Sequence, residues 1–303
     1  MARRRRGEPI DGVLLLDKCE GMTSNRALQR ARALFQARKA GHTGTLDPMA
    51  TGLLPVCFGE ATKFAAWLLD ADKHYRASVR LGAVTATGDR EGELLETRPV
   101  PPIARQTLLE TLSALTGEID QVPPMYSALK LGGRPLYELA RAGREIERAP
   151  RRVSIYHMAL VEQRVDGFTL DVSVSKGTYV RSLAEDIGER LGCGAHLDGL
   201  RRLKTGPFDA TAMSELAALE SLSPDERLAR LLPVDALIAH LPVLETDDEG
   251  AGRMRCGQAI AIDDRGLSPG THARLYHGHT LLGVVDISVS GQCAPKRLIR
   301  TAD

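Results

Sequence analysis

The sequence predicts an α+β fold: a mostly antiparallel sheet with flanking helices, followed by a small C-terminal β-barrel. Strand and helix patterns are interspersed along most of the chain, without the regular alternation that indicates parallel βαβ units. After about residue 245 the pattern changes to short segments punctuated by glycine, which is typical of a small barrel. The 303 residues, 43% of them hydrophobic, suffice for about two domains with a sizeable core.

The first strand and the first helix are predicted near the N-terminus. The apolar run DGVLLLDK (11–18) is typical of a short buried strand. Thr23 or Ser24 can cap the helix that follows, because each side chain offers an oxygen to the free N–H groups of the first turn. The apolar residues of this helix fall on one face, at Leu28, Ala31, Leu34 and Phe35.

Three more strands and a second helix are predicted in the middle of the chain. In 74–84, apolar side chains alternate with polar and basic ones, which indicates a half-buried strand with a basic outer face. Segments 151–162 and 168–180 show further strand patterns. We expect Tyr179 and Arg181 at the end of the last strand, on one side, because residues i and i+2 share a face. A helix follows, marked by Leu183, Ala184, Ile187 and Leu191.

The C-terminal barrel is predicted from four β-like segments. Prolines and an acidic patch between about 233 and 250 end the helical part of the chain. The β-like segments that follow are 257–262, 272–278, 279–289 and 294–299.

Composition excludes several classes of protein. No apolar run approaches the ~20 residues that span a membrane, and the arginines at 3–6 precede too short an apolar run for a signal peptide. The five cysteines are odd in number and lack CxxC spacing, which argues against a disulfide framework and a zinc site and favours the reducing cytoplasm. With a net charge of +1, a nucleic-acid surface would require local clustering of basic residues.

The segment GHTGTLDPMATGLLP (41–55) places Asp47 in a loop bounded by glycine and proline. Such a carboxylate is either a turn residue or a chemical reagent. The Thr-Gly-Thr run resembles the phosphorylation loop of transport ATPases, but there an aspartate precedes that run. Neither a P-loop nor a GxSxG elbow is present. A glycosidase would need a second carboxylate, which spacing alone does not exclude, although none shares a comparable loop.

Partners for Asp47 are offered by SKGTYVRSLAEDIG (175–188). If this segment lies beside the 41–48 loop, Arg181 can pair with Asp47 and keep the carboxylate ionised within a pocket. Tyr179 would supply a ring face or a phenolic proton acceptor. By pattern alone, a surface ion pair and a core tyrosine are the alternative.

Four long motifs together resemble the TruB type of bacterial tRNA pseudouridine-55 synthase. They occur in the family's order at 41–55, 127–148, 176–188 and 192–208. The resemblance covers about residues 8–208 and implies that the tail is a PUA domain, the RNA-binding barrel of that family. It implies a cofactor-free isomerisation of uridine-55 in the T-loop of tRNA. The base would be flipped out of the loop, and an aspartate would drive cleavage and re-formation of the glycosidic bond.

The resemblance also implies three catalytic residues. Asp47 matches the essential aspartate, Tyr179 the tyrosine beside the target base, and Arg181 the arginine that pairs with the aspartate. Tyr179 is then the candidate that removes the C5 proton.

Further positions match residues that contact the substrate. Tyr75 matches the tyrosine that stacks on the flipped uracil, His42 the histidine that fills the vacated space, and Leu200 an apolar wall. For His42, the ordinary alternative is a structural histidine. Lys18 and Asp89 also fall at family positions, with Cys19 where the family usually has a proline.

Two basic clusters are expected to contact RNA phosphates, which would position the substrate while its loop shape specifies it. The resemblance implies that the first cluster lies in a mobile insertion at about 124–152 that closes over the T-arm; a solvated helix with salt bridges is the alternative. This insertion supplies Lys130, Arg141 and Arg144, and the second cluster comprises Arg201, Arg202 and Lys204.

The expected organisation is therefore a basic tail (1–10), a catalytic domain (11–240) containing this insertion, and a PUA-like RNA-binding domain (245–303). We expect a cytoplasmic monomer whose partner is the T-arm of tRNA, with no metal and no membrane contact. An RNA-binding chaperone for tRNA folding is the alternative function, and it is compatible with catalysis in the same chain.

Overall fold

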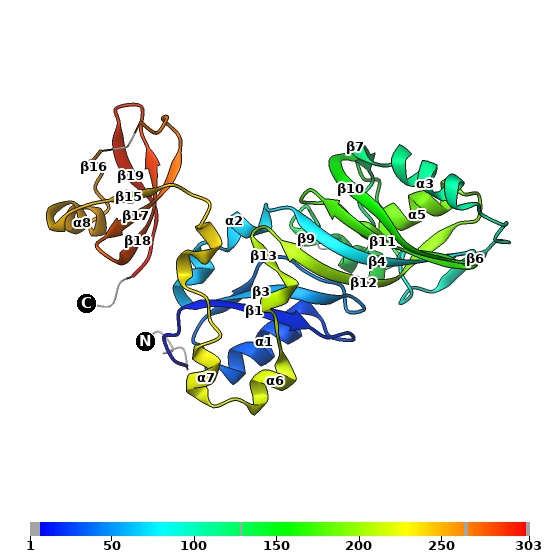
Figure 1. The fold of residues 1–303 in the computed structure, drawn as a ribbon, viewed down its shortest axis with the longest axis horizontal. Coiled ribbons are helices and arrows are strands. Elements are labelled where there is room, and N and C mark those ends of the chain that lie inside the picture. Colours follow the sequence, from blue (N-terminus) through cyan, green and yellow to red (C-terminus); the bar gives the residue numbers. More distant parts are fainter. Residues whose placement is uncertain (1–6, 128, 264–265, 301–303) are drawn as a thin grey trace.

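The computed structural model describes residues 7–127, 129–263 and 266–300, and a ten-stranded sheet forms its main body (Figure 1). The order is β14-β1-β3-β12-β4-β11-β10-β7, with β13 beside β12 and β2 beside β3. Two pairings, β1 with β14 and β3 with β12, are parallel and the other pairings are antiparallel. The prediction of a mostly antiparallel sheet is confirmed. The strands are β1 (Gly12–Lys18), β2 (Ala40–His42), β3 (Thr51–Phe58), β4 (Lys73–Leu81), β7 (Gly117–Gln121), β10 (Arg151–Arg164), β11 (Gly167–Val174), β12 (Ala195–Thr205), β13 (Phe208–Asp209) and β14 (Ser214–Glu215).

Helices flank this sheet at both of its ends. In Figure 1, α1 and α6 lie beside β1 and β3, whereas α3 lies beside β10. Helix α5 packs against β12 and β4. Their apolar faces share one core with one face of the sheet, through residues such as Leu28, Leu108 and Leu183. The helices of the chain are α1 (Ser24–Leu34), α2 (Ala65–Leu69), α3 (Arg105–Ala114), α4 (Leu136–Arg141), α5 (Val180–Arg190), α6 (Leu216–Ser221), α7 (Pro224–Leu228) and α8 (Asp248–Arg255). None of the described helices is both long and apolar enough to cross a membrane.

The uninterrupted apolar run of β1 is explained by burial on both faces of the strand. Leu14 and Leu16 pack into the core shared with the helices. Val13 and Leu15 point the other way, into a second core that includes Leu237. Because side chains alternate along a strand, both faces need apolar residues when both are covered.

Most of the predicted elements of the main body are confirmed. Thr23 caps α1 by accepting a hydrogen bond from the backbone N of Arg26 at 3.2 Å. In β4, Tyr75 is buried and Arg76 exposed, as the alternating pattern predicts. Short hairpins outside the main sheet are β5 (Ala83–Thr85) with β6 (Leu94–Thr97) and β8 (Lys130–Leu131) with β9 (Arg134–Pro135).

The predicted strand position of Tyr179 and Arg181 is wrong. Strand β11 ends at Val174, Tyr179 is the N-cap of α5, and Arg181 lies in the first turn of that helix. Gly177, with a φ of +80°, makes the turn that separates strand from helix.

The C-terminal part forms a five-stranded sheet in the order β15-β17-β18-β19-β16, drawn in orange and red in Figure 1. Each of the four predicted β-like segments overlaps a strand, whereas β15 lies before them; the strands are β15 (Val243–Glu245), β16 (Ile260–Ala261), β17 (His272–His277), β18 (Thr280–Ile287) and β19 (Gln292–Leu298). Helix α8 was not predicted, because Gly250 and Gly252 weaken its helical pattern. This sheet has its own core and also packs Leu281 and Val284 against the main body.

Candidate active site

One cavity of about 930 Å³ lies where the 41–48 loop, β4, the loop after β5 and the β11–α5 connection meet. It brings together most of the residues that the sequence singles out, although they are far apart in the chain. Those that line it are His42, Asp47, Tyr75, Asp89, Tyr179, Arg181, Leu200 and Arg202.

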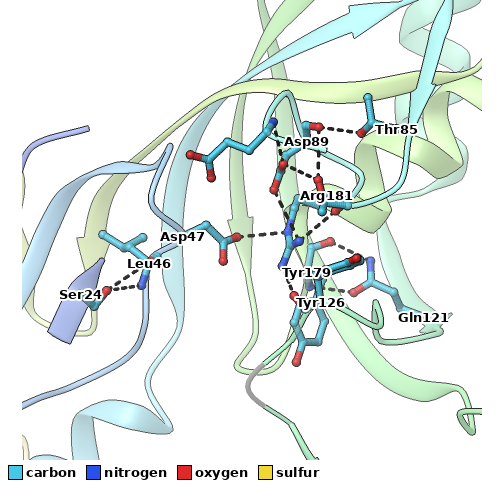
Figure 2. A network of polar contacts seen from close by, with 11 residues as sticks. Ser24, Leu46, Asp47, Thr85, Asp89, Gln121, Tyr126, Tyr179 and Arg181 are labelled. Atoms are coloured by element: carbon cyan, nitrogen blue, oxygen red, sulfur yellow. Dashed lines mark hydrogen bonds and ion pairs between the residues drawn. The ribbon is translucent and has the colours of Figure 1, made fainter. Parts of the chain in front are cut away.

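Arg181 is the centre of a polar network in this cavity (Figure 2). Its Nε lies 3.1 Å from Oδ2 of Asp47, the ion pair that the sequence predicts. Its terminal nitrogens donate to the carbonyl oxygens of Thr87 at 2.9 Å and Tyr126 at 2.7 Å, and one lies 3.5 Å from Oδ2 of Asp89. The Arg181 side chain is 6% exposed and that of Asp47 is 35% exposed. The arginine is therefore fixed, whereas the carboxylate keeps a face towards the cavity.

The environment of Asp47 raises its pKa above the ordinary value of 3.8. Burial is the largest cause, because it disfavours the charged carboxylate, and the nearby Asp89 adds to the effect. Arg181 and Lys18 oppose it. The ion pair thus limits a shift that burial would otherwise make larger, and the ionised carboxylate needs a higher pH than a free aspartate does.

Two buried side chains hold the loop on either side of Asp47. Ser24 both donates to the carbonyl oxygen of Leu46 at 3.0 Å and accepts from its N–H at 2.8 Å. Lys18 is 0% exposed, and its Nζ donates to the carbonyl oxygens of Met22 at 2.6 Å, Cys19 at 3.0 Å and Pro48 at 3.2 Å. This differs from the predicted contact of Lys18 with the substrate, because three carbonyls already occupy its three protons.

Replacing Lys18 with methionine is expected to lower the free energy of unfolding by about 1–3 kcal/mol, the cost of leaving buried polar groups without partners. The rate of turnover should fall as well, because the carbonyl of Pro48 loses its anchor. Denaturant unfolding and turnover of the variant measure both effects. Lys39→Met is the control, since Lys39 is an exposed lysine. Equal stability of the two variants would contradict the anchoring role.

His42 faces the cavity from the end of β2. Burial lowers the pKa of its imidazole, and the nearby Arg202 lowers it further, which favours the neutral ring. Its Nδ1 is buried and has no hydrogen-bond partner among the described residues. A structural histidine, the alternative for this residue, would have such a partner. The unpaired Nδ1 therefore favours a role of His42 at the cavity.

The second basic cluster does not form the single RNA-contacting patch that was predicted, because Arg201 and Arg202 point to opposite faces of β12. Arg202 is 1% exposed and donates to the carbonyl oxygens of Leu53 at 2.7 Å and Gly44 at 3.3 Å. It therefore braces the Asp47 loop and does not present its charge at the surface. Arg201 points away and pairs with Asp17, with 2.5 Å between Nη2 and Oδ2. Lys204 is exposed.

The segment 124–152 adds residues that the sequence reasoning missed. Tyr126, Ser127 and Tyr137 line the cavity, and Lys73 joins them from β4. The available sequence signal was the pair of tyrosines, Tyr126 and Tyr137, at the motif 127–148. Arg144 is exposed, while the side chains of Lys130 and Arg141 lie outside the described part of the structure. Across the described ranges, no group of three or more His, Cys, Asp or Glu side chains is placed to hold a metal ion.

Comparisons with known families match nearly the whole chain. A model described as "TruB family pseudouridylate synthase (N terminal domain)" matches residues 32–180. Models described as "tRNA pseudouridylate synthase B C-terminal domain" and "Pseudouridine synthase II TruB, C-terminal" match 181–239 and 242–299.

Similar full-length proteins are known from several bacteria. The "tRNA pseudouridine synthase B" of Chromohalobacter salexigens is 59% identical over 302 residues, which cover 100% of this chain and 98% of that protein. The protein of the same name from Aromatoleum aromaticum is 52% identical over 292 residues, covering 96% and 94% of the two chains. Among solved structures, a chain of a Cbf5-Nop10-Gar1 complex aligns with a TM-score of 0.71 at 25% identity, covering 92% of this chain and 79% of that one. A chain of an H/ACA RNP with a substrate RNA has the same fold, with a TM-score of 0.72 at 22% identity and coverage of 99% and 92%.

Proposed function

The chain belongs to the TruB family of pseudouridylate synthases, and we propose that it converts uridine-55 in the T-loop of tRNA to pseudouridine. It is an isomerase that acts on tRNA, as the names of its full-length relatives describe. The observation that carries the proposal is the Asp47–Arg181 ion pair in a cavity lined by the rings of Tyr75 and Tyr179.

The proposed reaction breaks the N1–C1′ bond of the uridine and forms a C5–C1′ bond in its place. C5 loses a proton and N1 gains one, so atoms and electrons balance without a cofactor. Asp47 is the nucleophile that forms a covalent intermediate with the sugar or the base. Tyr179 is the group that accepts the C5 proton, because it lines the same cavity beside Arg181.

The base must leave its stack to reach Asp47, which costs a few kcal/mol and least for a loop nucleotide. The rings of Tyr75 and Tyr179 offset part of this cost by stacking on the flipped uracil. Leu200 closes the cavity with an apolar wall, and the neutral ring of His42 occupies the space that the base vacates. Asp89 supports this arrangement, because its carboxylate lies 3.5 Å from the guanidinium of Arg181.

We propose the same domain boundaries that the sequence predicts. Residues 11–240 catalyse, the insertion at about 124–152 holds the T-arm through Lys130, Arg141 and Arg144, and Arg201 adds a separate phosphate contact. Residues 245–303 form a PUA-like RNA-binding domain; their separate core and exposed arginines support this role. Residues 1–10 are a basic tail. We further propose a cytoplasmic monomer whose RNA contact is the T-arm.

Nucleoside analysis tests the proposed function. A T-arm stem-loop is incubated with the protein, digested to nucleosides and analysed for pseudouridine and free uracil. One pseudouridine per RNA is expected. Free uracil would indicate a glycosidase, and unmodified uridine would leave only an RNA-folding role.

Neutralising exposed arginines of the C-terminal part of the chain (245–303) is expected to weaken binding of full-length tRNA and to leave the T-arm stem-loop unaffected. Arg255 and Arg297 are suitable, since both are exposed. In the Arg255→Gln/Arg297→Gln protein, each lost phosphate contact should reduce the log–log salt slope by about 0.7–0.9. Titrations of both RNAs over a salt series measure this. Equal losses on the two RNAs would refute docking by this part of the chain.

A further inference from the structure

The backbone of Tyr179 is held by a side chain that sequence reasoning missed. Gln121, the last residue of β7, is 3% exposed. Its Oε1 accepts from the Tyr179 N–H at 2.8 Å, and its Nε2 donates to the Tyr179 carbonyl oxygen at 3.1 Å, as Figure 2 shows. One planar amide thus pairs with both backbone groups of one residue, as a neighbouring strand would.

This pairing satisfies a free backbone N–H at the start of α5. Tyr179 is the N-cap residue, but its own side chain makes no capping hydrogen bond. Its N–H has no partner within the helix, because the first N–H groups of any helix lack one. Gln121 supplies that partner and fixes where α5 begins. Arg181, two residues further on, takes its direction from the same turn.

A second contact joins the same two regions. The guanidinium of Arg181 donates to the carbonyl oxygen of Tyr126 at 2.7 Å. Gln121 and Tyr126 flank the point where the 124–152 insertion leaves the sheet, and Gln121 lies opposite Arg151, where the insertion returns. The root of the insertion therefore contacts the backbone of one proposed catalytic residue and the side chain of the other.

We propose that Gln121 is a positioning residue that sets the Tyr179 backbone and, through the first turn of α5, aims Arg181 at Asp47. It also ties this geometry to the root of the insertion, so that the reactive groups and the RNA-holding segment share one anchor. This inference rests on the proposed function, since it assigns a role in that reaction. A displacement of about 1 Å in such a site costs up to about 10²-fold in rate.

The test replaces Gln121 with methionine in the full-length protein, which keeps the volume and removes both hydrogen bonds. The single-turnover rate on a T-arm stem-loop should fall by about 10- to 100-fold. The Kd for that RNA should stay within about threefold, because phosphate contacts supply most of the affinity. Gln163→Met is the matched control: Nε2 of Gln163 donates to the Ile103 carbonyl at 2.9 Å on a different part of the sheet. Its rate should equal that of the wild type.

Gln121→Glu gives a signature that a general loss of stability would not. An ionised carboxylate would face the Tyr179 carbonyl without a proton to donate, whereas a protonated carboxyl has the donor and acceptor of the amide. The ratio of the variant rate to the wild-type rate should therefore rise as the pH falls. Arg151, the register partner of Gln121, and Arg181, in the first turn of α5, are charged groups near this position.

Three outcomes distinguish a failure of the inference from a failure of the proposed function. A Gln121→Met rate within about twofold of the wild type, with the wild type active, overturns the positioning role alone. A pH-independent ratio for Gln121→Glu overturns it even if the methionine variant does not fold. A wild-type protein that forms no pseudouridine overturns the proposed function itself.

Discussion

Replacing Asp47 with asparagine is expected to abolish pseudouridine formation while the Kd for a T-arm stem-loop changes by less than tenfold, ~1.4 kcal/mol. An amide lacks the nucleophilic carboxylate oxygens, so the covalent step cannot occur. Affinity comes mainly from phosphate contacts that the substitution does not touch. Single-turnover assays and RNA titrations of the same preparation measure the two effects.

Asp171→Asn is a matched control for that experiment. Asp171 also pairs with an arginine, at 2.8 Å from Arg76, but it is half-buried on β11 and does not line the cavity. This variant should keep the wild-type rate. If Asp47→Asn retained more than a few per cent of the wild-type rate, Asp47 would not be the nucleophile.

Replacing Arg181 with methionine should lower activity and move the acid limb of the pH–rate profile to higher pH. Burial already raises the pKa of Asp47, and Arg181 is the group that opposes this shift most strongly. Without the guanidinium the pKa rises further, so the carboxylate stays protonated, and inactive, up to a higher pH. An opposite charge this close favours the ionised carboxylate, so we expect its loss to move the limb to higher pH.

Arg181→Lys separates charge from geometry in that experiment. Lysine keeps a positive charge near Asp47 but cannot reproduce the fork that also reaches Thr87 and Tyr126. Its acid limb should stay closer to that of the wild type, while its rate falls because Arg181 no longer holds the surrounding loops. An acid limb that does not move in Arg181→Met would refute the electrostatic role.

The sequence predicts the sheet well because its signals are local. Alternation in β4 and the double burial of β1 both leave a readable periodicity, and the order of the strands agrees with a mostly antiparallel arrangement. The boundary at Tyr179 was missed because Gly177 turns the chain before the alternation ends. A single glycine can redirect a backbone without changing the polarity pattern around it.

The residues of the candidate site that the sequence predicts are those whose side chains the proposed chemistry requires. Residues whose side chains bind backbone groups were predicted less well. Asp47 and Arg181 stand out by residue type and meet in the structure as expected. Lys18 and Arg202 have the same appearance in a sequence as surface cations, yet both are buried and bind carbonyl oxygens. No local pattern in the sequence marks Gln121, because the residue that it binds, Tyr179, lies 58 residues away.

The most direct test of the account uses a T-arm RNA whose target uridine carries tritium at C5. The wild-type protein should release one tritium for every pseudouridine formed, with no free uracil, because C5 exchanges its hydrogen for the bond to C1′. Asp47→Asn should bind the same RNA and release none. Tritium release by Asp47→Asn at the wild-type rate, or free uracil in place of pseudouridine, would contradict the assignment of Asp47 and its Arg181 partner to this isomerisation.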